Sequence, residues 1–323
     1  MNNLKVYIPT CDPHLFAIEG FAYFFNKYWG EDFDVKVLGF SEPEFELPSN
    51  FEFISMAKEQ VGRSKGWSNY IIDFFESIDD EHFIFGIDDF YMVRPFDREV
   101  YETLLKEISD EKVGRIDLQP SIQHCRNPED VSVYKEFDDF KILELRQRSA
   151  ASFIYRISGQ FSIWNREYFL KNLQRDWTVH QWELVGGKLA EGDGYKILGT
   201  ADRWCAKKIE LVSDNQYPGK LNVFGMREED ISKVKEFYSH RSEEIDNFSP
   251  DKKYLVTGAS GFLGEALLAR LENFGCTNVV TVCRNEGNLV QTKQNFPWLE
   301  IVPGDISHPH CLHKTIEDVS GVF

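Results

Sequence analysis

The chain has 323 residues, which is enough for two domains with a hydrophobic core each. Its formal net charge of −17 at pH 7 argues against a nucleic-acid-binding surface, because contacts with phosphates need clustered Lys and Arg. No apolar run reaches the length of a membrane span, so a membrane-spanning protein is not predicted.

The cysteines and the N-terminus indicate a reducing compartment. The six cysteines are scattered and form no Cys-x-x-Cys pair, which predicts neither a zinc knuckle nor a disulfide framework. The segment 1–5 leads directly into a strand-like stretch and lacks the architecture of a signal peptide. We therefore expect a cytoplasmic protein.

The first 90 residues alternate apolar strand-like runs with amphipathic helical segments. Strand, helix and strand in this order predict a parallel sheet with right-handed crossovers. The predicted strands cover 5–10, 34–40, 51–54 and 83–87, and the predicted helices cover 16–29 and 69–78, the second capped by Ser68.

The middle of the chain is less regular. A helix over 99–108 and a strand over 114–118 precede a stretch, 121–150, that we expect to be irregular. Residues 153–170 predict a strand pair followed by a helix from about Asn165, and 195–199 predict another strand. The later elements are a charged helix over 228–241 and a linker over 242–251 that ends a first domain.

Two adjacent carboxylates, Asp88 and Asp89, follow the predicted strand 83–87, whose apolar character suits burial on both faces. Ligands of α/β sheets gather at the carboxyl ends of the strands. Two carboxylates there are costly unless they are solvated, paired or bound to a cation, and a divalent metal carrying a diphosphate would account for them. Adjacent Asp residues after a strand also occur simply as turn residues, and this alternative stays open.

The character of the chain changes after residue 252. Gly258, Gly261 and Gly264 form a Gly-x-x-Gly-x-x-Gly motif between a strand at 254–257 and a helix at 265–274, the context in which such a motif indicates a dinucleotide site. The glycines permit a tight turn, a close approach of a pyrophosphate to the helix N-terminus, and close packing of helix and strand.

The stretch from Thr257 to Gly264 resembles the start of the extended short-chain dehydrogenases, which include the NAD(P)-dependent nucleotide-sugar epimerases and dehydratases. The resemblance covers 253–323. It implies an NADP or NAD site, with NADP favoured because Arg284 stands where NAD-preferring members carry an acidic residue. The implied cofactor-binding residues are Gly258, Ser260, Gly261, Phe262, Leu263, Gly264, Arg284 and Asp305.

This second region departs from the family in one respect. The catalytic Tyr-x-x-x-Lys of the family would lie beyond residue 323, and the last residues resemble the beginning of another strand. We therefore expect an incomplete Rossmann domain, cut from a longer reading frame, that does not catalyse redox chemistry by itself.

The first region, about 4–225, resembles glycosyltransferases of the GT-A fold, whose short Asp motif binds the metal and diphosphate of a nucleotide sugar. The resemblance rests on Asp88-Asp89, on the stretch 158–167 and on Trp182-Glu183. It implies Mn²⁺ or Mg²⁺ at Asp88 and Asp89, with Glu183, or else Asp202, as the base that deprotonates the acceptor. The implied substrate-binding residues are Arg63, Lys65, Trp164 and Trp182.

Each of these residues also has a plain structural interpretation. Glu183 suits an exposed helix position beside a buried Trp, and Arg63 and Lys65 suit a solvated loop. The predicted fold is α/β, with a GT-A-like mixed-sheet domain (1–225), a charged helix and linker (226–250), and the first half of a Rossmann-type parallel sheet (251–323).

The predicted function is metal-assisted transfer of a sugar from a nucleotide-sugar donor to a carbohydrate acceptor in surface polysaccharide or nucleotide-sugar metabolism. The alternative is an NAD(P)-dependent epimerase, dehydratase or reductase with a noncatalytic N-terminal binding module. Neither hypothesis names the donor sugar.

Overall fold

The structure is a computed structural model that describes residues 3–57, 66–125, 127–149, 154–210, 226–245, 252–273, 276–283, 286–305 and 319–322. The chain divides into two compact units, 1–237 and 238–323, and each is described by itself. Within the described residues, no helix is long and apolar enough to cross a membrane.

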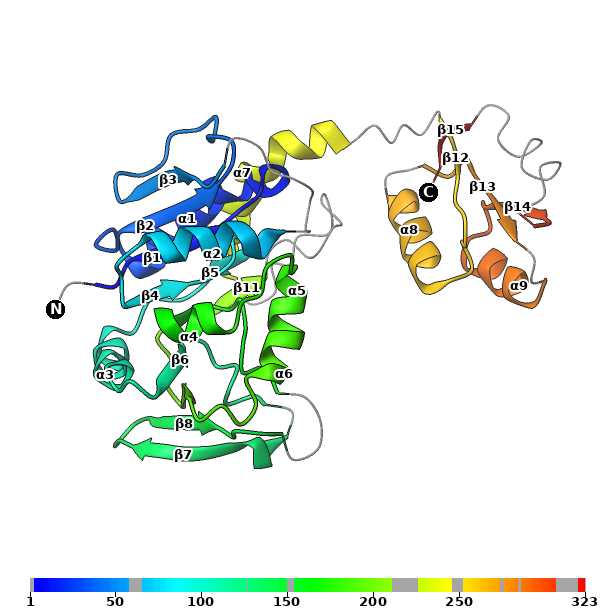
Figure 1. The fold of residues 1–323 in the computed structure, drawn as a ribbon. Helices are drawn as coiled ribbons and strands as arrows, with labels where there is room; N and C mark the ends of the chain where they lie inside the picture. The colour runs from blue at the N-terminus through cyan, green and yellow to red at the C-terminus, as the bar shows by residue number, and fades with distance from the viewer. Residues whose placement is uncertain are drawn as a thin grey trace. The chain divides into compact units, whose positions relative to one another are not determined.

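A nine-stranded mixed sheet organises the first unit, in the order β3-β2-β1-β4-β9-β6-β10-β8-β7 (Figure 1). Strands β3, β2, β1 and β4 are parallel, β9 runs antiparallel between β4 and β6, and β10 is parallel to β6. The strands are β1 (Val6–Pro9), β2 (Val35–Gly39), β3 (Phe51–Ser55), β4 (His82–Phe85), β6 (Val113–Asp117), β7 (Val131–Glu136), β8 (Lys141–Leu145), β9 (Ser162–Asn165) and β10 (Lys196–Ala201). This is the mixed sheet of an α/β fold that the sequence predicts for the first unit.

Aromatic side chains cover both faces of this sheet. On one face, α2 (Trp67–Ser77) and α4 (Arg166–Lys171) pack through Phe75 and Phe169, whose ring centroids lie 4.8 Å apart. On the other face, α1 (Ala17–Trp29) packs Phe21 against Phe161, with centroids 6.1 Å apart. Both patterns follow from apolar residues at helical spacing, which the sequence shows.

The remaining elements of this unit pack on the faces of the large sheet or beside it. They are the short sheet of β5 (Phe90–Met92) and β11 (Lys208–Glu210), the helix α3 (Arg98–Ile108), the 3₁₀ turns η1 (Asp12–His14) and η2 (Pro128–Asp130), and a continuous helical segment of α5 (Val179–Gln181), the π-helical η3 (Trp182–Gly186) and α6 (Gly187–Leu189). Asp97 caps α3 by accepting a hydrogen bond from the Val100 amide.

Three local predictions were wrong. Residues 121–150 contain the antiparallel pair β7–β8 rather than irregular chain. Only β9 is present among the described residues of the predicted strand pair in 153–163. Ser68 does not cap α2, which begins at Trp67; its hydroxyl is buried and accepts a hydrogen bond from the Trp177 amide at 2.9 Å.

The first part of α7 (Glu228–Ile245) belongs to the first unit, because it is docked on α1. The carboxylate of Asp230 is fully buried and accepts hydrogen bonds from the Lys27 ammonium and the Tyr28 hydroxyl. Arg227 completes this network, since its guanidinium donates to the Tyr28 oxygen at 2.7 Å. A buried carboxylate satisfied by several donors fixes the position of the helix.

Four parallel strands form the sheet of the second unit, in the order β14-β13-β12-β15. They are β12 (Lys253–Leu255), β13 (Val279–Cys283), β14 (Glu300–Pro303) and β15 (Val319–Val322), accompanied by α8 (Phe262–Asn273) and α9 (Glu286–Asn295). This is the 3-2-1-4 arrangement with which a Rossmann sheet begins, so the predicted fold class is confirmed here as well.

The Asp230 network gives the first testable prediction. Replacing Asp230 by Asn removes the negative charge that pairs with Lys27 and turns one of the two acceptor oxygens into an amide donor, so the free energy of unfolding should fall by about 2–3 kcal/mol. The matched control is Glu229→Gln, whose exposed ion pairs should contribute less than about 0.5 kcal/mol. Urea unfolding followed by tryptophan fluorescence reports the first unit, which holds six of the seven tryptophans.

The same network should respond to acid. Burial raises the pKa of Asp230, but hydrogen bonds from Lys27 and Tyr28 outweigh it and hold that pKa below its ordinary value. Its stabilisation is therefore complete above about pH 4 and is lost as the pH falls through the lowered pKa. Equal losses of stability in wild type and Asp230→Asn between pH 5 and pH 3 would contradict this assignment.

Candidate functional site

The turn after β4 places Asp88 inside the carboxyl edge of the large sheet. The chain reverses between Ile87 and Phe90, whose amide donates to the Ile87 carbonyl at 3.4 Å. Asp88 is only 6% exposed, and its carboxylate accepts a hydrogen bond from the Thr10 hydroxyl at 2.6 Å. Because Thr10 follows β1 and β1 pairs in parallel with β4, the ends of these two strands converge on one carboxylate.

A second polar connection lies at the same edge. The carboxylate of Asp12 accepts hydrogen bonds from the amide and the hydroxyl of Ser41, at 3.0 and 3.1 Å, and so joins the ends of β1 and β2. His14, in η1, has its Nδ1 3.9 Å from an Asp88 oxygen and is about one third exposed. Sequence reasoning missed Thr10, Asp12 and His14, although a polar run directly after the first strand was a usable signal.

Glu183 reaches the same region from η3. Its Oε1 accepts hydrogen bonds from the Gly159 amide at 2.7 Å and from the Ser158 hydroxyl at 3.2 Å. Gly159 in turn lies against the Ile87 side chain, which would be 3.5 Å from a Cβ at that position. The Glu183 side chain is therefore half-buried and fixed by hydrogen bonds to a loop that lies against Ile87 of the Asp88 turn. It is not a solvated helix position.

The direction of β9 explains this convergence. Because β9 is antiparallel to β4, Ser162 at its start pairs with Phe85 at the end of β4. The loop before β9 thus lies at the edge where β4 ends, although it is about 75 residues away in sequence.

Asp202, the second candidate base, lies farther along the edge. It follows β10, which is separated from β4 by β9 and β6, or about 14 Å at the usual strand spacing. Its φ of 73° is in the left-handed region, which is uncommon for a residue other than Gly. This turn directs Arg203 to Asp97, where the guanidinium donates at 2.9 and 3.0 Å, so the strain has a structural reason.

The two tryptophans expected at the sugar are core residues in this structure. Trp164 and Trp182 are both fully buried, with ring centroids 5.6 Å apart, and Trp182 also packs on Phe85 and Phe169. Rings covered in this way present no face to a sugar, so sugar stacking at these positions is corrected to core packing. Arg63 and Lys65 lie outside the described residues.

Asp88 and Asp89 suit a divalent cation in one respect. Both follow β4 at the edge of the sheet, Asp88 buried and Asp89 half-buried. The described residues hold no group of three or more His, Cys, Asp or Glu that would form a complete site. Two carboxylates match a cation such as Mg²⁺, which keeps several waters and takes its other ligands from substrate phosphates.

The glycine motif of the second unit has the geometry expected of a phosphate-binding turn. Gly258 has a φ of +65°, and its carbonyl accepts a hydrogen bond from the Gly261 amide at 2.9 Å. The turn opens directly into α8 after β12, so amides of the helix N-terminus face the end of the strand. A Cβ on Gly264 would lie 2.2 Å from the Gly258 carbonyl oxygen, so only glycine fits there.

The other predicted cofactor residues are placed only in part. Ser260 lies in the turn and Asp305 follows β14, both half-buried. The backbones of Phe262 and Leu263 form the first turn of α8. Arg284 comes directly after β13 and lies outside the described residues.

Comparison with known families gives a match within the second unit, where the sequence resembles the short-chain dehydrogenases. Residues 254–323 match the model of the NAD dependent epimerase/dehydratase family. No curated protein matches the chain.

Solved structures similar to this chain include enzymes that handle nucleotides and sugars. The glycosyltransferase GlyE of Streptococcus pneumoniae TIGR4 is 8% identical with a TM-score of 0.38, over 100% of this chain and 85% of that one. An apo-UDP-glucose pyrophosphorylase is 9% identical with a TM-score of 0.35, over 74% and 100%. A CMP:2-keto-3-deoxy-manno-octonic acid synthetase complexed with CTP is 11% identical with a TM-score of 0.34, over 73% and 98%. Scores this low carry no argument about function.

The glycine turn allows a matched pair of substitutions. Gly264→Ala forces its Cβ into backbone atoms that cannot move aside and should destabilise the second unit by about 3 kcal/mol. Gly261→Ala meets the Gly258 carbonyl oxygen at 3.3 Å and should cost about 1 kcal/mol or less. Hydrogen exchange of the β13 amides measures both, and equal protection in the two variants would contradict the close-packing role of Gly264.

Proposed function

We propose that the first unit is a glycosyltransferase that moves a sugar from a nucleotide-sugar donor to a carbohydrate acceptor with the help of a divalent cation. One observation supports this above the others: the buried carboxylate of Asp88 lies at the carboxyl edge of the sheet and is held by Thr10, and its neighbour Ile87 lies against Gly159, whose amide donates to Glu183. Open α/β sheets bind their ligands at this edge.

Asp88 and Asp89 would hold the cation, Mn²⁺ or Mg²⁺, and through it the diphosphate of the donor. When bound, the cation supplies positive charge that stabilises the departing diphosphate. Thr10 keeps the Asp88 carboxylate oriented, because its hydroxyl donates to one of the two oxygens. His14 adds positive charge near the same carboxylate when its imidazole is protonated.

Glu183 is the proposed general base of an inverting transfer. Its Oε1 is occupied by Gly159 and Ser158, while its other oxygen accepts no hydrogen bond from a described residue. The second oxygen of Glu183 takes the proton of the acceptor hydroxyl. At the same time the hydroxyl oxygen of the acceptor attacks the anomeric carbon, and the bond from that carbon to the diphosphate breaks. Asp202 is the weaker candidate, because two strands separate β10 from β4.

A second function is proposed for the other unit. The match to the epimerase/dehydratase family and the glycine turn support binding of NADP or NAD at the N-terminus of α8. An epimerase, dehydratase or reductase activity with a noncatalytic first unit remains the rival hypothesis. A transferase joined to an enzyme that modifies nucleotide sugars would suit polysaccharide assembly in the cytoplasm.

Donor binding tests the transferase proposal. A panel of nucleotide sugars with Mn²⁺ should contain one that stabilises the chain by about 2.7 kcal/mol at a hundredfold excess over its Kd. Asp88→Ala combined with Asp89→Ala should abolish this stabilisation, while Asp79→Ala, an exposed carboxylate before β4, should keep it. Thermal unfolding measures the effect, and the absence of any donor-dependent shift in the folded wild type would refute the proposal.

Substitution of the base separates binding from chemistry. Glu183→Gln keeps the hydrogen bonds from Gly159 and Ser158 and should leave donor Kd within about twofold, while kcat falls by about 10²- to 10⁴-fold. Asp202→Asn should reduce kcat by less than about tenfold if Glu183 is the base. The reverse pattern would transfer the role to Asp202. The measurement is the rate of sugar transfer to an acceptor, monitored through the nucleotide that is released.

A further inference from the structure

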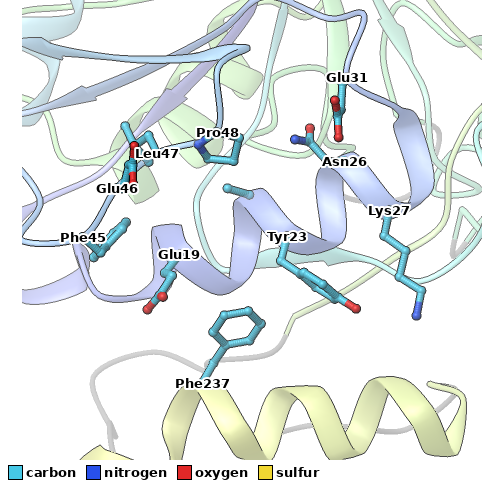
Figure 2. A pocket seen from close by; sticks show the side chains of 11 residues that line it. Glu19, Tyr23, Asn26, Lys27, Glu31, Phe45, Glu46, Leu47, Pro48 and Phe237 are labelled. Atoms are coloured by element: carbon cyan, nitrogen blue, oxygen red, sulfur yellow. The ribbon is translucent and has the colours of Figure 1, made fainter.

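A hollow of the first unit lies along α1, and neither Asp88 nor Asp89 lines it. It has a volume of about 460 Å³ and is bounded by α1, by the loop between β2 and β3 and by α7 (Figure 2). All the residues that line it belong to the first unit, including Phe237 of α7. The residues that line it are Glu19, Ala22, Tyr23, Asn26, Lys27, Glu31, Phe45, Glu46, Leu47, Pro48 and Phe237.

Three aromatic rings face this hollow from three different elements. Tyr23 comes from α1, Phe45 from the loop and Phe237 from α7, and Figure 2 shows the Glu19 carboxylate between Phe45 and Phe237. The rings of Tyr23 and Phe237 lie 5.5 Å apart, centroid to centroid. Aromatic faces carry a negative electrostatic potential and attract cations, most strongly when several surround one site.

The charged groups of the hollow are mostly negative. Glu19, Glu31 and Glu46 line it, and none of these carboxylates forms an ion pair with a described residue. Lys27 is the lining residue of opposite charge, but its ammonium is bound to the buried Asp230 of the α7 network. The same ammonium lies 6.0 Å from the centroid of the Tyr23 ring, so among the described residues the lining lysine serves Asp230 and this ring but pairs with none of the three lining carboxylates.

The protein already shows this chemistry beside the hollow. The Lys233 ammonium, which is not a lining group, lies 5.3 Å from the Tyr23 centroid and 4.9 Å from the Phe237 centroid. The two rings thus accept an ammonium group in this geometry. A ligand of the hollow would meet the same rings together with Phe45 and Glu19.

We propose that this hollow binds a small organic cation, an amine or a quaternary ammonium group, at a site separate from that of the nucleotide sugar. The rings supply cation–π contacts, and Glu19 and Glu46 supply the counter-charge. A neutral sugar would also stack on the aromatic rings, but it would not neutralise the negative charge of the lining carboxylates. Since α7 forms one wall of the hollow, a ligand bound there would also contact both α1 and α7.

A matched pair of probes tests the role of charge. Choline and 3,3-dimethylbutan-1-ol have the same shape, but only choline is charged. Calorimetric titration of the whole chain at low ionic strength should give a Kd on the order of 1 mM for choline and binding at least about tenfold weaker for the alcohol. No binding of choline, equal binding of the alcohol, or equal binding of methyl glucoside would overturn the proposal.

Substitutions locate the binding. Glu19→Gln and Phe45→Ala should each weaken choline binding by about fivefold, and neither residue belongs to the Asp230 network that docks α7. Glu42→Gln, an exposed carboxylate that does not line the hollow, should have no effect. Unchanged binding in both cavity variants would overturn the assignment. Asp88→Ala should leave choline binding intact, so failure of the transferase proposal would not decide this one.

Discussion

The hydrogen bond between Thr10 and Asp88 marks the constraint on which the first unit depends: β1 and β4 are neighbours and run in the same direction. Parallel neighbours end at the same edge of a sheet, so the polar residues that follow them must meet. A buried carboxylate in such a position costs free energy unless donors or a cation satisfy it. The fold supplies one donor in Thr10 and leaves the rest of the carboxylate facing the edge where a substrate would bind.

The antiparallel strand β9 completes the site. It begins where β4 ends, and therefore brings the loop containing Ser158 and Gly159 to the Asp88 turn. Glu183 is hydrogen-bonded to that loop, so the proposed base, the two adjacent carboxylates and the strand ends lie along one edge. The core beneath consists of packed rings, including Trp164 and Trp182, which stiffen the support of Glu183 but do not touch a ligand.

The two units carry different kinds of information about function. The second has a glycine turn whose backbone conformation and packing favour glycine, and it matches the model of the NAD dependent epimerase/dehydratase family. The function of the first is argued from the placement of a few polar groups. Its closing helix, α7, is fixed on α1 by the buried Asp230 and borders a hollow with a chemistry of its own.

The sequence by itself determined the parts of this protein that local patterns encode. Apolar runs and helical periodicity predicted the strands and helices of the first 90 residues, and the spacing of three glycines predicted the turn after β12, because each pattern reflects short-range geometry. It also placed Asp88 and Asp89 at a strand end.

Tertiary structure decided what depends on residues far apart in the chain. Nothing local shows that Glu183 is held by Gly159, that two strands separate Asp202 from β4, or that Trp182 is covered on its faces. The hairpin β7–β8 was missed for a related reason: β7 lies at the edge of the sheet, and its exposed side chains give it little apolar pattern. Strand order and direction set these distances, and they arise from long-range pairing that periodicity does not encode.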